Sequence, residues 1–63
     1  MTPNEKELLE EFKGVDKASV VTMSKEMALS IDYIQSLCKS LVAQGFLEVV
    51  TPGRWPAYKV KGK

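Results

Sequence analysis

The stretch from residue 30 to residue 45, SIDYIQSLCKSLVAQG, constrains the fold of this chain more than any other. A helix over residues 31–44 would place its apolar side chains three and four residues apart, which gathers them on one side. Ser30 is suited to cap the start of this helix, and Gly45 to end it. The apolar side chains, which predict the centre of a small core, are Ile34, Leu37, Cys38, Leu41 and Val42.

The opposite side of this predicted helix is polar. An arc of short or hydrogen-bonding side chains fits a groove or a partner surface, so we expect contacts with another molecule there. Cys38 lies on the apolar side, and the chain has no histidine to activate it, which indicates a small buried residue rather than a nucleophile. The outward residues are Asp32, Gln35, Ser36, Lys39, Ser40 and Ala43.

The length of 63 residues predicts one domain spanning residues 1–63. A domain of that size buries only about 60% of its unfolded surface. A hydrophobic fraction of 44% and a charged fraction of 27% are typical of a globular chain rather than a disordered one. No apolar run approaches the roughly 20 residues of a membrane span, and the N-terminal MTPNEKELLEE is acidic where a secretory signal is basic. We therefore expect a cytoplasmic protein that does not contact a membrane.

The sequence contains no recognisable catalytic or metal-binding pattern. One cysteine and no histidine exclude an internal disulfide and a Cys/His zinc site. The chain also has no glycine-rich phosphate loop and no evident pair of pocket-forming carboxylates. We expect a protein that is not an enzyme and that uses no metal and no cofactor.

The N-terminus carries a start signal for a helix over about residues 3–13. Thr2 is suited to cap it, Pro3 to occupy its first position, and Glu5 to close a capping box. We expect Gly14 to end the helix and Val15 to turn back into the core.

A second helix is predicted over about residues 17–27, with Asp16 as its N-cap. Val20, Met23 and Met27 recur at helical spacing. A strand over residues 18–23, ASVVTM, is the alternative because these residues have high β-propensity. The periodicity favours the helix.

The connection to the next helix has only three residues, 28–30, with Leu29 pointing inward. So short a connection predicts a steep crossing, the helix-turn-helix unit. From residue 46 the period becomes two, and FLEVVT and AYKV flank the turn signal PGRWP, which predicts a hairpin over about residues 46–60. We expect Glu48 and Lys59 to face water. The side chains expected to face the core are Leu47, Val49, Tyr58 and Val60.

Residues 27–30, MALS, resemble the Leu-Gly-Ile-Ser turn of the winged helix-turn-helix family of DNA-binding domains, and residues 45–47, GFL, resemble its Gly-Leu-Ile entry to the wing. Ile34, Cys38 and Leu41 match three buried positions of the family's recognition helix. The resemblance covers residues 5–60 and points to no specific member. It implies a mainly α fold with a small β-hairpin, an α+β winged helix-turn-helix of three helices and a C-terminal two-stranded wing. Ala28 replaces the usual turn glycine.

A narrower resemblance concerns the winged helices that bind Z-DNA. Residues 56–60, PAYKV, are similar to the end of their wing. Those proteins also contact phosphates through Asn and Tyr on the third helix, where this chain has Gln35 and Lys39. The main determinants of left-handed DNA binding are therefore missing.

The winged-helix resemblance implies that the N-terminal half of the third helix enters the major groove of duplex DNA. Gln35 is suited to bond an adenine edge, Tyr33 and Ser36 to reach bases or phosphate, and Lys39 and Ser40 to bind the backbone.

Asp32 would repel phosphate, so we expect it to favour the helix dipole or orient a neighbour rather than contact the duplex. On the wing, Arg54 is suited to lie beside the minor groove, with Lys59 and Lys61 on nearby phosphates. The predicted DNA-binding residues are Tyr33, Gln35, Ser36, Lys39, Ser40, Arg54, Lys59 and Lys61.

These side chains also have simpler interpretations. Tyr33, Trp55 and Tyr58 are more often core or hairpin packing than base-stacking groups in a domain this small. Gln35 and Ser36 also suit an ordinary solvated helix surface.

The charge is divided unevenly along the chain. Residues 1–30 hold six acids and four lysines, whereas residues 31–63 hold two acids and five bases, Lys63 among them. The net charge is only +1 and the pI about 7.8, below the values above about 9 that mark strongly basic nucleic-acid binders. The sequence thus predicts a small DNA-binding transcriptional regulator, a monomer or weak homodimer. The alternative is a winged-helix module that binds a protein.

Overall fold

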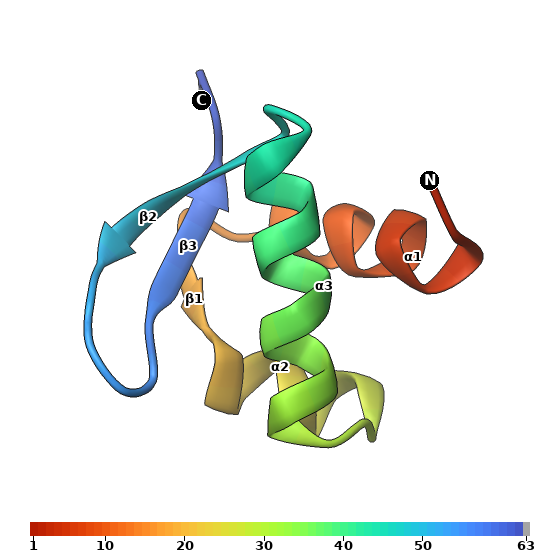
Figure 1. The fold of residues 1–63 in the computed structure, drawn as a ribbon. Helices are drawn as coiled ribbons and strands as arrows, with labels where there is room; N and C mark the ends of the chain where they lie inside the picture. Colours follow the sequence, from red (N-terminus) through yellow and green to blue (C-terminus); the bar gives the residue numbers. More distant parts are fainter. Residues whose placement is uncertain (63) are drawn as a thin grey trace.

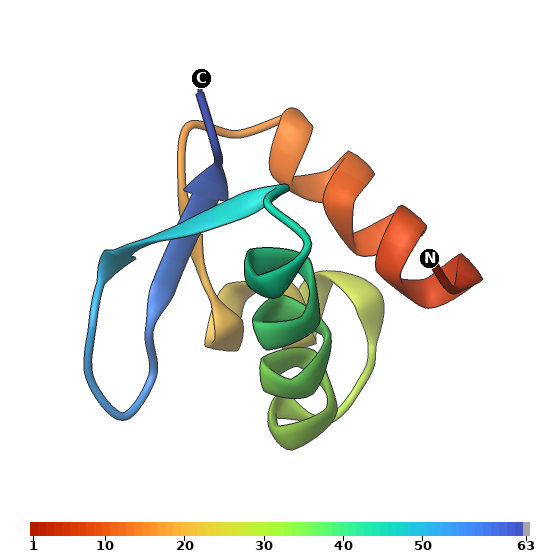
Figure 2. The same cartoon turned by 45° about the horizontal axis from the view of Figure 1, so that its top comes forward.

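The structure, a computed structural model, describes residues 1–62 (Figure 1). In that range three helices and three short strands follow one another in a winged helix-turn-helix order, which confirms the expected fold class. In both views the β2–β3 hairpin stands to one side of α3 and α1 to the other (Figure 2). The elements are α1 (Pro3–Lys13), β1 (Ala18–Ser19), α2 (Val20–Met27), α3 (Ile31–Ala43), β2 (Leu47–Thr51) and β3 (Ala57–Val60).

Helix α1 begins and ends where the local signals predict. The Thr2 hydroxyl accepts a hydrogen bond from the Glu5 N–H at 3.2 Å, and the Glu5 carboxylate accepts one from the Thr2 N–H at 3.0 Å. The prediction that Val15 enters the core is wrong, because its side chain is 39% exposed. Its N–H bonds the Phe12 carbonyl and closes the turn after α1, and this turn leaves the side chain facing outward.

Helix α2 begins three residues later than predicted, at Val20, and its N-cap is Ser19 rather than Asp16. The Ser19 hydroxyl accepts the Thr22 N–H at 3.2 Å. Strand β1 pairs Ala18 with Tyr58 and Ser19 with Ala57, which holds these residues extended. The alternative prediction of a strand over residues 18–23 is therefore correct for residues 18 and 19 and wrong for residues 20–23, which are helical.

The turn between α2 and α3 relies on a left-handed residue that is not glycine. Ala28 has φ 55° and ψ 40°. The Leu29 N–H donates to the Ser24 carbonyl at 3.1 Å, and the Ser24 hydroxyl donates back to the Leu29 carbonyl. Ser30 then caps α3 by accepting the Tyr33 N–H at 3.2 Å, as predicted.

Helix α3 buries the predicted apolar side against α1, α2 and the sheet. Phe12 of α1 and Tyr58 of β3 meet edge to face in this core, with ring centroids 6.5 Å apart and planes at 81°. Gly45 ends the helix with φ 86°, and the N–H groups of Gly45 and Phe46 satisfy carbonyls of its last turn. The buried apolar residues are Leu8, Leu9, Phe12, Val20, Met23, Ile34, Leu37, Cys38, Leu41, Leu47 and Tyr58.

The wing is a hairpin as predicted, but it belongs to a three-stranded antiparallel sheet in the order β1–β3–β2 rather than a two-stranded one. Glu48 and Lys59 pair across the hairpin at 3.2 Å. The prediction that Val49 faces the core is wrong, because it is 48% exposed. Strand β2 is an outer strand and diverges from α3 as it runs toward the wing tip (Figure 1), so its first residue, Leu47, is buried and its last three are exposed.

Candidate nucleic-acid interface

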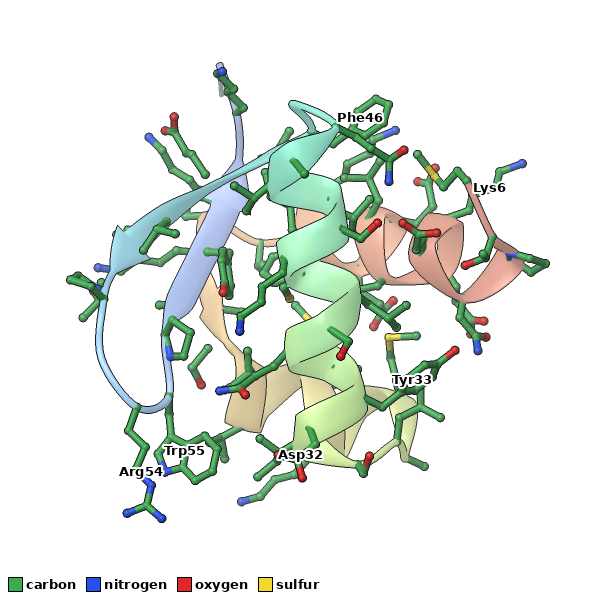
Figure 3. The ribbon with its side chains drawn as sticks, viewed as in Figure 1. Lys6, Asp32, Tyr33, Phe46, Arg54 and Trp55 are labelled. Carbon is green, nitrogen blue, oxygen red and sulfur yellow. The ribbon has the colours of Figure 1, made fainter. Side chains whose placement is uncertain are left out.

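The exposed side of α3 lies between the wing and α1 (Figure 3). Its outermost residues are Asp32, Ser36, Lys39 and Ala43, all exposed. They are spaced four, three and four residues apart, so they form one row along the helix. We call these four residues the α3 row.

The edge of α3 that faces the wing is fixed by Gln35. Its side-chain amide Nε2 donates a hydrogen bond to the backbone carbonyl of Arg54, at 2.9 Å. Arg54 belongs to the loop that joins β2 to β3. This one bond joins the helix predicted to read DNA to the tip of the wing.

The other edge of α3 faces α1 and is also hydrogen-bonded. The Tyr33 hydroxyl accepts from the Asn4 side-chain amide at 2.8 Å. The Glu5 carboxylate accepts from the Ser40 hydroxyl at 2.6 Å and from the Gln44 side-chain amide at 2.8 Å. These contacts join α1 to this edge of α3.

Glu5 is a buried carboxylate at the centre of that edge, only 6% exposed. Hydrogen bonds to its charged form lower its pKa from 4.5 to about 2, first that from the Ser40 hydroxyl and then that from the Thr2 N–H. The carboxylate is therefore ionised at neutral pH and holds its donors in place.

The wing tip presents a cation and an aromatic ring to solvent. The Arg54 guanidinium carbon lies 5.4 Å from the centre of the Trp55 ring, a cation–π geometry. Trp55 is 45% exposed, so it is not buried packing. Both side chains lie at the tip of the wing, to the left of the N-terminal end of α3 as drawn in Figure 3.

The structure separates the predicted site residues into three groups. Ser36 and Lys39 lie on the α3 row, whereas Gln35 and Arg54 meet at the wing. Tyr33 and Ser40 lie on the α1 edge, where their side-chain oxygens already have partners. Lys59 is paired with Glu48, and Lys61 follows β3 at the end of the wing remote from its tip. Lys63 lies outside the described residues.

Sequence reasoning missed the second role of Glu5 and the contacts of Asn4 and Gln44. The capping box identified Glu5 as a local cap, but its contacts with Ser40 and Gln44 join positions 35 and 39 residues apart. No local pattern signals such pairs. Trp55 was predicted to pack in the hairpin or, in the alternative function, to contact a protein, and its position beside Arg54 required the folded loop.

Cys38, the one cysteine of the chain, is buried beneath this surface. Burial raises the pKa of the Cys38 thiol to about 12, so the sulfur stays protonated and inert. Residues 1–62 contain no group of three or more His, Cys, Asp or Glu side chains placed to hold a metal ion. Among the same residues, no helix has the length and apolar character needed to cross a membrane.

Several solved structures share this fold. Wild-type MarR from E. coli in its apo form has a TM-score of 0.87 at 15% identity, covering 98% of this chain and 48% of its own. A MarR mutant from E. coli complexed with operator DNA has a TM-score of 0.86 at 15% identity, with 98% and 46% covered. The adhesin competence repressor AdcR from Streptococcus pyogenes has a TM-score of 0.85 at 17% identity, with 98% and 48% covered.

This chain thus spans about half the length of the solved chains it resembles. The likeness shows a winged helix-turn-helix fold. No protein-family model matches the sequence, and no curated protein matches it.

Proposed function

We propose that this chain binds duplex DNA as part of a transcriptional regulator, with α3 in the major groove and the wing along the backbone. The observation that carries the proposal is the exposed α3 row beside a wing whose tip is hydrogen-bonded to the same helix. A major groove about 12 Å wide admits one helix, and the wing extends the contact to flanking phosphates. A structural neighbour of this fold, the MarR mutant, is complexed with operator DNA.

The proposed contacts follow the three groups of residues. Ser36 and Lys39 face the bases or the nearest phosphates, and Arg54 lies beside the minor groove. Lys59 and Lys61 extend the basic surface along the wing toward further phosphates. Tyr33, Gln35 and Ser40 flank the row, and each contacts DNA only if it gives up or shares the hydrogen bond it makes in the free chain.

The proposal assigns no catalytic role and no cofactor, and it places the chain in the cytoplasm. We expect the chain to be a monomer or a weak homodimer. Analytical ultracentrifugation at micromolar concentration measures this state.

Salt dependence of duplex binding tests the proposal. About four phosphate contacts weaken affinity by roughly two orders of magnitude between about 50 and 200 mM salt. Arg54→Ala is expected to lower the slope of log affinity against log salt by about 1. Lys6→Ala is the matched control, because Lys6 lies on α1, away from the wing (Figure 3), and its loss leaves the slope unchanged. Binding that is undetectable, or that ignores salt, would refute the proposal.

A second candidate function is protein binding through the wing. Its observation is the exposure of three large apolar side chains there, Val49, Val50 and Trp55. Protein interfaces are rich in exposed aromatic anchors of this kind. In that case Trp55→Ala abolishes capture of a protein partner while duplex affinity is negligible in both forms of the chain. Retained capture by this variant would exclude the wing as the protein-binding surface.

A further inference from the structure

Asp32 is an unpaired acid at the N-terminal end of the α3 row, on the surface proposed to meet DNA. Its carboxylate is exposed, and within residues 1–62 it makes no hydrogen bond and no ion pair. The polar side chains on both edges of α3 have internal partners: Gln35 toward the wing, and Tyr33 and Ser40 toward α1. The sequence-based expectation that Asp32 orients a neighbour therefore finds no neighbour in the structure.

The position of Asp32 determines what it can meet. It lies in the first turn of α3, on the same row as Ser36 and Lys39. The N-terminal residues of a recognition helix face the base edges, whereas a carboxylate on a phosphate would be repelled. An acid in this place is compatible with DNA only where the bases present hydrogen-bond donors.

The bases differ in what they present in the major groove. Cytosine presents its N4 amino group as a donor, and aspartate is a natural acceptor for it. Guanine and thymine present carbonyl oxygens there, which a carboxylate repels. Adenine presents a donor and an acceptor side by side, which suits a neutral amide better than an acid.

We propose that Asp32 is a specificity-determining residue that selects cytosine in one strand of the bound duplex. This inference rests on the proposed function. The Asp32 carboxylate lowers the general affinity for phosphate. It also raises the free-energy penalty for binding any base other than cytosine at one position. Ser36 and Lys39 lie one and two turns further along the row, and they contact the adjoining base pairs or the DNA backbone.

An alternative explanation for Asp32 is helix stability alone. An acid in the first turn interacts favourably with the positive end of the helix dipole. Ser30 already caps this helix, so the dipole interaction is the remaining structural role for Asp32. The two roles differ in their readouts, since only one of them changes which base is preferred.

The experiment selects duplexes from a randomised library with the wild-type chain and with Asp32→Asn, Asp32→Ala and Asp16→Asn. Asp16→Asn removes the same charge from the turn after α1 and is the control for net charge. The best wild-type duplex is then measured with each base at the selected position, and with N4-methylcytosine, which blocks the amino hydrogen that faces the major groove.

The wild type is expected to select cytosine at one position and to lose about tenfold or more in affinity for any other base there. N4-methylcytosine gives a similar loss. Asp32→Asn shifts the preference to adenine, which an amide bonds in bidentate fashion. Asp32→Ala removes the preference, and Asp16→Asn keeps it.

Two results would overturn the inference. If Asp32→Asn selects the same base as the wild type and only unfolds at a lower temperature, Asp32 serves the helix and not the reading of bases. If the wild type binds no duplex at about 50 mM salt, the proposed function fails and the inference fails with it. The first result leaves the proposed function intact, so the two failures are distinguishable.

Discussion

The hydrogen bond from Gln35 to the Arg54 carbonyl predicts that one side chain controls the position of the wing tip. We expect Gln35→Met to release the tip. Methionine has a similar length and nearly the same helix propensity as glutamine, so α3 itself is preserved while the donor is lost. Gln44→Met is the matched control, since it removes an equivalent amide from the α1 edge of the same helix.

The size of the effect follows from the bond itself. A hydrogen bond of 2.9 Å to a backbone carbonyl contributes about 0.5 to 1.5 kcal/mol net. A difference of 1.4 kcal/mol is a factor of ten, so the fraction of molecules with a detached tip rises about 2- to 12-fold. The core residues of α3 do not touch this bond and keep their protection.

Amide hydrogen exchange in the free chain measures this change without DNA. Protection of the hairpin amides nearest the loop, at Thr51 and Ala57, falls about 2- to 12-fold in Gln35→Met relative to that of Leu41 in the core. Gln44→Met leaves the ratio unchanged. The reasoning is refuted if the wing exchanges equally in Gln35→Met and wild type, or if Gln44→Met loosens it as much.

Three further predictions concern the helices and the core. Ala28→Gly relieves the left-handed strain between α2 and α3 and is expected to raise the unfolding free energy by about 0.5–1 kcal/mol, seen as a higher Tm, whereas Ala43→Gly at the end of α3 lowers it. Glu5 has a lowered pKa of about 2, chiefly through the hydrogen bond from Ser40, so its contribution to stability is complete above about pH 4.5 and is lost as the pH falls toward 2. Acid titration of unfolding in Glu5→Gln should lack that part of the pH dependence. Cys38, whose thiol pKa is raised to about 12 by burial, stabilises the fold below pH 9 and loses that contribution as the pH rises from 9 toward 12. Its alkylation in the native chain at pH 8 should be slower than in urea by a factor on the order of 100 or more, and equal rates would show that the core is open.

Local signals in the sequence accounted for most of the fold. The caps of α1 and α3, the stop at Gly45 and the hairpin depend on interactions within about four residues, or on a change of hydrophobic period, and both are visible in one dimension. The buried side of α3 was predictable for the same reason. The resemblance on residues 27–30 and 45–47 then favoured one arrangement of these elements.

Contacts between distant positions decided the parts that were predicted wrongly. Strand β1 has two residues, too few for any period, and it exists because Ala18 meets Tyr58 forty residues later. That pairing holds residues 18 and 19 extended and moves the start of α2 to Val20. Val15 stays exposed because the turn after α1 leaves its side chain facing outward. Val49 has the right period for a core position but is exposed, since β2 leaves α3 and nothing covers its middle.

In the candidate site, too, some features follow from the sequence and others only from the tertiary structure. The amino-acid sequence by itself determined that α3 has a polar side, that a hairpin with basic residues follows it in the chain, and that this side carries one acid, Asp32, and one base, Lys39. Only the tertiary structure decided which of those polar side chains are free. The wing occupies Gln35, and α1 occupies Tyr33 and Ser40, because a helix surface is divided among the elements that pack along its two edges. Among the described residues, the α3 row is what remains exposed between these two edges, and it is therefore the part of α3 that we propose to meet DNA.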